Sequence, residues 1–220
     1  MRGQWERRTS ESYDEVARAY ADMTRSAPAE NLHMASDYAR LADLALCASG
    51  VEPATVVDVG CGPGWWVKYL ADRGVRAAGI DVSPRMIDLA RSATPHAHFE
   101  VGSILDLPLP SQYATAVCCM YVLHHLPDED VDAALAELFR ILAPGGVLLL
   151  GGHVGHEATT KMQGYGGHPM HVHINKRSTG FWEHAVERVA LTIEAHVIYG
   201  PGQLESSHAL FARRDASCAH

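Results

Sequence analysis

The chain has 220 residues, of which 47% are hydrophobic and 20% are charged, and its formal net charge is −8. This length and balance are typical of one folded domain with a full core. The basic residues are scattered rather than gathered into a stripe, which argues against binding to a nucleic-acid backbone. We therefore expect a single domain, residues 1–220, that acts on a small-molecule partner and binds no nucleic acid.

The cysteines and the apolar runs indicate the cellular compartment in which we expect the protein. The chain has five cysteines, and the adjacent pair Cys118 and Cys119 lies inside an apolar run, which is not the pattern of a disulfide framework. The N-terminal residues are charged, and runs such as "VLLL" fall far short of the roughly 20 apolar residues that span a bilayer. We expect a cytoplasmic monomer or homodimer with reduced thiols and no membrane contact.

The first elements in chain order are helices within residues 10–49. Ser12 and Glu15 have the spacing of a capping box ahead of an amphipathic segment. Tyr13 and Tyr20 are seven residues apart and so share one helix face. We expect residues 1–50 to form a helical lid whose phenols reach a ligand, with packing of this face on the core as the alternative.

Strand-like and helix-like segments then alternate. Ser83 and Pro84 mark one helix start, because serine caps helices and proline suits the first helical position. The strands are apolar runs, as in sheets covered by helices on both faces. The expected strands are 54–60, 75–82, 96–102, 115–123 and 147–154, and the expected helices are 65–74, 83–92 and 128–146. The pattern predicts an α/β, Rossmann-like doubly wound, mostly parallel seven-stranded sheet, with residues 54–154 as the cofactor-binding core.

A segment rich in glycine and histidine, residues 155–175, interrupts this alternation. Long irregular insertions in compact domains are usually binding loops, so we place it on the substrate side. A last helix at about 178–190 and two terminal strands complete residues 176–214.

The strongest chemical signal is "VVDVGCGPG", residues 56–64, in which a strand runs into Gly60, Gly62 and Gly64. Such a turn brings a ligand against bare main chain. Asp81 ends the next predicted strand, where a carboxylate can accept hydrogen bonds from a ribose. Trp65 occupies the place where a dinucleotide fingerprint needs a small residue, and no Walker lysine follows, so NAD, FAD and nucleoside triphosphates are disfavoured.

With these motifs the chain resembles the class I S-adenosylmethionine-dependent methyltransferases, in particular the small-molecule enzymes of the methyltransferase-domain 11/25 type. The matching stretches are "VVDVGCGPGWW", "GIDVSPRMIDLAR", "FEVGSILDLPLP", "VLHHLPDED" and "ELFRILAPGGVLLL". The resemblance implies S-adenosyl-L-methionine as cofactor. It implies these cofactor-site residues: Asp58, Gly60, Cys61, Gly62, Asp81, Val82, Met86, Ser103, Ile104 and Met120. Gly64 of the glycine turn and Tyr20 of the expected lid are added to them as further cofactor contacts.

The resemblance also assigns individual roles. Asp81 would hold the ribose hydroxyls, Asp58 would orient the glycine loop, and Ser103 and Ile104 would meet the adenine edge. The family commonly has an aspartate at the position of Ser103, so the charged contact to the adenine amino group is weakened here.

Candidate catalytic and substrate residues are aromatic or titratable. His124 and His125 are the expected catalytic pair, since histidine titrates near neutral pH and this turn follows a strand end. The alternative is that both histidines form hydrogen bonds with the turn backbone or with groups of the cofactor site. The expected substrate contacts are Tyr13, His153, Tyr165, His168, His171 and His173. Lys176 and Arg177 are expected to be surface charges, and no metal site is expected.

The expected function is methyl transfer to an oxygen, nitrogen or carbon of a small organic acceptor, with specialised metabolism as a plausible setting. Two alternatives stay open. One is a protein that binds the cofactor and catalyses a reaction without methyl transfer, such as a cyclisation. The other is a metal-dependent enzyme that uses the histidine cluster between His153 and His173.

Overall fold

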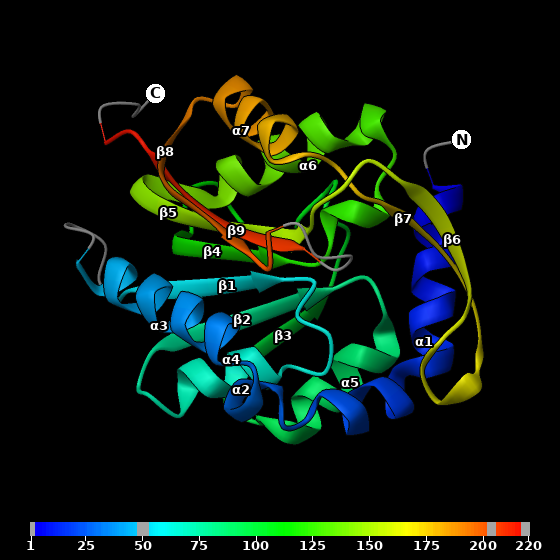
Figure 1. Ribbon diagram of the computed structural model, residues 1–220. Helices are drawn as coiled ribbons and strands as arrows, with labels where there is room; N and C mark the ends of the chain where they lie inside the picture. The colour runs from blue at the N-terminus through cyan, green and yellow to red at the C-terminus, as the bar shows by residue number, and fades with distance from the viewer. Residues whose placement is uncertain (1–2, 48–52, 202–205, 217–220) are drawn as a thin grey trace.

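A seven-stranded sheet forms the centre of the computed structural model, which describes residues 3–47, 53–201 and 206–216 (Figure 1). The strands lie in the order β3-β2-β1-β4-β5-β9-β8. Their bounds are β1 Thr55–Val59, β2 Arg76–Asp81, β3 His98–Val101, β4 Ala114–Met120, β5 Leu142–His153, β8 Leu191–Tyr199 and β9 Ser207–Arg214. Only β9 runs against its neighbours, so the predicted mostly parallel, doubly wound sheet is confirmed.

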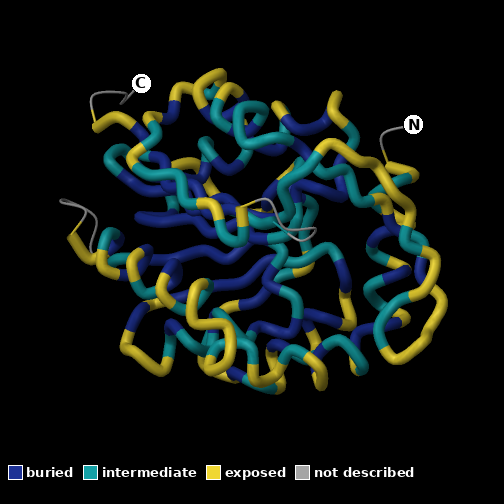
Figure 2. The backbone as a smooth tube through the Cα atoms, viewed as in Figure 1, coloured by how far each residue is buried: buried dark blue, intermediate teal, exposed yellow. Residues whose placement is uncertain are grey.

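Helices cover both faces of this sheet. The helices that follow the lid are α3 Leu32–Cys47, α4 Trp65–Ala71, α5 Pro84–Ala93, α6 Asp128–Ile141 and α7 Thr179–Arg188. Alternate strand residues serve the two cores: Val56 and Cys118 pack with α3, α4 and α5, whereas Val57 and Cys119 pack with α6 and α7. This two-residue period places a buried layer on each side of the strands (Figure 2).

The strand order reverses between β1 and β4, because the chain winds outward in one direction through β2 and β3 and in the other through β5. In open α/β sheets, ligands bind at the carboxyl ends of the strands at such a reversal. Two segments cover this edge in Figure 1: helix α1, Gln4–Thr24, and a ribbon of two antiparallel strands, β6 Ala158–Gln163 and β7 Pro169–Asn175. A short helix, α2 Ala27–Glu30, leads from α1 to α3.

The helix boundaries confirm one sequence prediction and correct two. Ser83 caps α5, since its hydroxyl accepts a hydrogen bond from the Met86 amide at 3.1 Å. Helix α1 begins at Gln4, so Ser12 and Glu15 are not a capping box. Ser12 instead lies inside the helix, and its hydroxyl accepts a 2.9 Å hydrogen bond from the His171 amide of β7. Helix α6 ends at Ile141 rather than at the predicted residue 146. Strand β5 begins at the next residue, Leu142, which pairs with Ala114 of β4.

Residues 1–2 and 48–50 of the expected lid lie outside the described residues. Within the described part of this segment, α1 covers the carboxyl ends of the strands, whereas α3 packs on one face of the sheet and is not part of a lid. No helix within the described ranges has both the length and the apolar character that a membrane crossing requires.

Candidate active site

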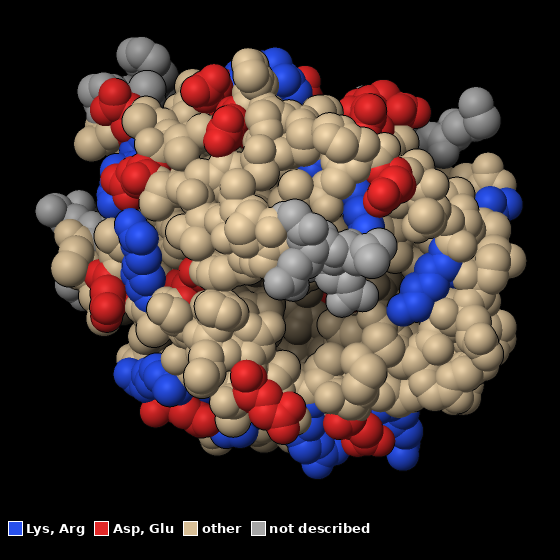
Figure 3. Space-filling view, in the orientation of Figure 1, with Lys and Arg blue, Asp and Glu red and all other residues tan. Residues whose placement is uncertain are grey.

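A cavity of about 360 Å³ lies at the carboxyl ends of β1, β2 and β4, beneath α1 and the β6–β7 ribbon. In Figure 3 the visible face is hollowed near its middle, with mostly uncharged atoms around the hollow. The volume falls within the roughly 300–1,000 Å³ that is usual for small-molecule sites. The lining includes thirteen of the residues predicted from sequence, namely Tyr13, Tyr20, Gly60, Gly62, Asp81, Val82, Met86, Ile104, Met120, His124, His125, His153 and Tyr165.

The glycine loop after β1 forms one wall of the cavity. Gly60 has a φ of 77°, and a Cβ added there would lie 2.1 Å from Cγ2 of Val122. Gly62 has a φ of 53°, and Tyr20 of α1 lies over it, with its Cε1 3.6 Å from where a Cβ would be. Glycine is therefore required at Gly60 for both conformation and space, and the loop presents main chain to the cavity.

Asp81 joins this loop to the end of β2. Its Oδ2 accepts a 2.8 Å hydrogen bond from the Gly62 amide, and its Oδ1 accepts a 2.9 Å hydrogen bond from the Ser83 amide. Burial raises the pKa of the Asp81 carboxyl to about 6, although these two amides oppose the shift. Because a carboxylate oxygen can accept more than one hydrogen bond, both oxygens can still receive ligand hydroxyls.

Three predicted cofactor residues lie behind the loop rather than in the cavity wall. Asp58 accepts a 3.2 Å hydrogen bond from the Tyr38 hydroxyl of α3, and burial raises its pKa to about 7. The hydrogen bond that orients the loop comes from Asp81, not from Asp58. Cys61 is buried and Gly64 caps α4, so both shape the loop from behind.

His125 belongs to a chain of three polar groups. It lies in the short helix η1, Leu123–His125, and its Nδ1 is 2.7 Å from the carbonyl oxygen of His173. A carbonyl only accepts, so Nδ1 carries the proton and Nε2 accepts from the Tyr13 hydroxyl at 2.9 Å. Burial lowers the pKa of His125 to about 4, so this imidazole is neutral at pH 7.

His124 and His153 extend the aromatic wall beside His125. The ring centroid of His124 lies 4.1 Å from that of His125 and 5.3 Å from that of His153. Burial lowers the pKa of His124 well below its ordinary value, which keeps this ring neutral as well. This end of the cavity thus presents the uncharged imidazoles of His124 and His125.

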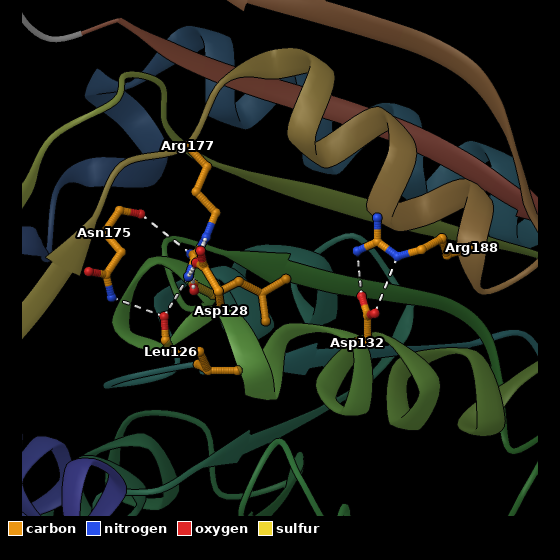
Figure 4. Close-up of polar contacts among 7 residues, drawn as sticks. Leu126, Asp128, Asp132, Asn175, Arg177 and Arg188 are labelled. Carbon is orange, nitrogen blue, oxygen red and sulfur yellow. Dashed lines mark hydrogen bonds and ion pairs between the residues drawn. The ribbon is translucent and has the colours of Figure 1, made fainter.

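Arg177 fixes the loop that carries these histidines, as Figure 4 shows. Its guanidinium donates to the Leu126 and Leu123 carbonyls at 2.6 and 3.1 Å and to Asp128 at 2.7 Å. Only 6% of Arg177 is exposed, so the expectation of a surface charge at this position is wrong. The guanidinium holds η1 and the start of α6 against the end of β7.

Three histidines of the insertion lie away from the cavity. His173 is exposed and its Nδ1 is 3.1 Å from the Thr160 hydroxyl, while His168 faces Glu15 at 3.7 Å. His171 borders a shallow surface hollow on the other side of β7, and it is Val172 and Ile174 that line the cavity. Within the described ranges, no three His, Cys, Asp or Glu side chains gather as metal ligands would.

Sequence reasoning missed four residues of the lining that carry chemistry. Tyr121 follows β4 with a φ of 60°, and its position at a strand end could have identified it. Trp5 and Glu6 of α1 and Lys161 of β6 reach the cavity only through tertiary packing, for which the sequence has no local signal.

Comparison with known proteins agrees with this geometry. Residues 56–146 match the profile of a methyltransferase domain family. Malonyl-[acyl-carrier protein] O-methyltransferase of Serratia marcescens is 38% identical over 94 residues, which are 43% of this chain and 36% of that protein. Trans-aconitate 2-methyltransferase of Variovorax paradoxus is 37% identical over 101 residues, 45% of this chain and 38% of that protein. The chain thus spans well under half the length of these two relatives.

Two solved structures share the fold over nearly the whole chain. One, from Haloferax volcanii, is a complex between the Trm112 methyltransferase activator and a methyltransferase, with a TM-score of 0.70, 19% identity and coverage of 96% of this chain and 100% of that one. The [4+2]-cyclase SpnF has a TM-score of 0.68 and 18% identity, with coverage of 96% and 97%. At such identities the likeness shows the fold alone. Residues 56–146 are thus similar to a methyltransferase domain, and nearly the whole chain has the fold of these two solved structures.

Proposed function

We propose that this chain transfers a methyl group from S-adenosylmethionine to an oxygen, nitrogen or carbon atom of a small organic acceptor. The observation that carries the proposal is the Asp81 carboxylate, which is bonded to the glycine loop and lines a cavity at the strand ends. A carboxylate at the end of β2 with spare lone pairs suits a ribose diol, and the adjoining bare main chain suits a ligand that must approach closely.

The residues in the cavity wall fit the cofactor by their chemistry. Asp81 would accept hydrogen bonds from the ribose, Gly60 and Gly62 would face the methionine part, and Val82 and Met86 would pack on the base. The sulfonium of the bound cofactor supplies an electrophilic methyl group. The protein then orients two molecules and excludes water, and such positioning contributes up to roughly 7–11 kcal/mol.

The end of the cavity lined by Tyr20, Tyr165 and Lys161 suits a methyl acceptor with an aromatic or otherwise planar body. Tyr20 packs edge to face on Tyr165, with ring centroids 4.7 Å apart. Lys161 lies over the Tyr165 ring at 4.0 Å, and among the described lining residues it is the one lysine or arginine. Aromatic walls with a single cation favour a neutral acceptor or one with a single acidic group.

His125 can take a proton from an acceptor only through Tyr13, because the Tyr13 hydroxyl already occupies its Nε2. For an acceptor that must lose a proton, we expect Tyr13→Phe to lower kcat about tenfold or more, within the range of general base catalysis. Binding of S-adenosylhomocysteine should change little. Steady-state kinetics with the methylated acceptor measures the effect. An unchanged kcat with a raised KM would show that Tyr13 only contacts the acceptor and does not transfer a proton to His125.

Cofactor binding should depend on pH through Asp81. Its pKa is raised to about 6, and only the ionised carboxylate accepts hydrogen bonds from both ribose hydroxyls. Affinity should therefore be full above about pH 7 and fall below pH 6, approaching tenfold per pH unit, because binding then requires loss of a proton. Calorimetric titration with S-adenosylhomocysteine between pH 5 and 8 measures this. Constant affinity across that range would show that Asp81 does not titrate on binding.

The test of the proposed function is a screen with methyl-labelled S-adenosylmethionine and a panel of small aromatic and carboxylic acceptors. We expect label in the acceptor and one S-adenosylhomocysteine per product, with full activity after chelation. Product formed without consumption of the cofactor would support a reaction such as cyclisation. Loss of activity on chelation would support a metal-dependent enzyme.

A further inference from the structure

Ser103 lies just after β3, between the lining residues Gly102 and Ile104, and its hydroxyl is already engaged. It donates a hydrogen bond to Oε1 of Glu6 and accepts one from the Leu105 amide at 3.0 Å. Ser103 therefore has little capacity left for a ligand. Glu6 lines the cavity, whereas its neighbours on this wall, Gly102 and Ile104, offer no polar side chain. The carboxylate at this end of the cavity comes from helix α1.

Helix α1 is anchored on both sides of Glu6. The Trp5 indole donates to Asp130 of α6 at 2.9 Å. Further along the helix, the Ser10 hydroxyl donates to the Val82 carbonyl at 2.8 Å, and Asp14 accepts from the Arg85 amide at 3.0 Å. These contacts fix α1 along the segment that follows Asp81, so the Glu6 carboxylate is held in place and is not a mobile surface charge.

We propose that Glu6 determines the specificity for the base of the cofactor, by accepting a hydrogen bond from the exocyclic amine of adenine. This inference rests on the proposed function, which puts the ribose at Asp81 and the base beyond it toward Met86 and Ile104. A carboxylate accepts from an amine but repels an oxo group, whose oxygen is also an acceptor. Glu6 therefore selects adenine over hypoxanthine and links cofactor affinity to the docking of α1.

Calorimetric titration with S-adenosylhomocysteine and its 6-oxo analogue, S-inosylhomocysteine, tests this selection. The unaltered protein should bind the adenine compound at least tenfold more tightly, as expected for one hydrogen bond to a charged group. In Glu6→Gln the preference should fall close to one, because the amide can present either its oxygen or its NH₂ group. In Glu6→Ala the affinity for the adenine compound should fall about tenfold, and addition of Ser103→Asp should restore it.

Glu11→Gln is the matched control, since Glu11 is an exposed acid of the same helix. It should leave both affinities unchanged, and thermal unfolding of each variant checks that α1 stays docked. An undiminished adenine preference in a folded Glu6→Gln would overturn the role of Glu6 while leaving the proposed function intact. Failure of the unaltered protein to bind S-adenosylhomocysteine would instead overturn both, and the two failures are thus distinguishable.

Discussion

Replacement of Asp81 by alanine is expected to weaken the binding of S-adenosylhomocysteine by at least about a hundredfold. The variant loses two hydrogen bonds from ribose hydroxyls to a charged acceptor, each worth about 1.5–3 kcal/mol, and a loss of about 3 kcal/mol is roughly a hundredfold. It also frees the Gly62 and Ser83 amides, which Asp81 holds at 2.8 and 2.9 Å. Calorimetric titration of the folded variant measures the change.

Asp72→Ala is the control for this experiment. Asp72 is an exposed acid that pairs with Lys68 at 2.8 Å on α4, away from the cavity. Its removal should leave the affinity unchanged. Normal affinity in Asp81→Ala would contradict the placement of the ribose and with it the map of the cofactor site.

Replacement of Gly60 by alanine is expected to destabilise the fold by about 2–5 kcal/mol and to abolish tight cofactor binding. The left-handed backbone costs an L-residue about 1–2 kcal/mol. The new methyl group would also lie 2.1 Å from Cγ2 of Val122, and overpacking of this kind adds about 1–3 kcal/mol. Urea unfolding monitored by circular dichroism gives the change in the free energy of unfolding.

Gly74→Ala separates the two causes. Gly74 has a φ of 78°, close to the 77° of Gly60, but a Cβ there would meet nothing within 4 Å. Substitution of Gly74 should therefore lower the free energy of unfolding by only about 1–2 kcal/mol, the cost of the left-handed backbone. Addition of Val122→Ala to Gly60→Ala should recover part of the lost stability. Equal losses for the two single variants would show that the contact with Val122 contributes nothing.

The side of the cavity formed by the glycine loop and Asp81 could be predicted from the sequence because its signals are local. Gly60 and Gly62 follow one strand and Asp81 ends the next, and parallel neighbours bring their carboxyl ends to one edge. The apolar strands and the Ser83 cap are local in the same way, since each depends on a few adjacent residues. These predictions needed no knowledge of tertiary packing.

The side of the cavity formed by α1 and the β6–β7 ribbon could be predicted only in part, because it depends on how these segments pack. Tyr13, His153 and Tyr165 line the cavity as expected, whereas His168, His171 and His173 do not. Successive side chains of β7 point to opposite faces, so Val172 and Ile174 lie on one face and His171 and His173 on the other. Which face meets the cavity depends on the packing of α1, whose Ser12 hydroxyl accepts a hydrogen bond from the His171 amide. The apolar face lines the cavity. His173 contributes its main-chain carbonyl to His125, a role that no side-chain pattern encodes.

Glu6, which accepts a hydrogen bond from Ser103, shows the same limit. The serine at position 103 suggested a weakened contact to the base, yet a carboxylate lies beside it, supplied from a helix 97 residues earlier in the chain. Serine thus replaces the usual aspartate at position 103, and helix α1 brings a carboxylate next to it. Only the tertiary structure reveals this contact.

A crystal structure with S-adenosylhomocysteine tests the central claim most directly, namely that the cavity at the strand ends is the cofactor site. We predict electron density for the ligand in this cavity, with both ribose hydroxyls within hydrogen-bond distance of Asp81 and the base beside Met86 and Ile104. Ligand bound elsewhere on the protein, or a cavity that remains empty at a saturating concentration, would contradict it.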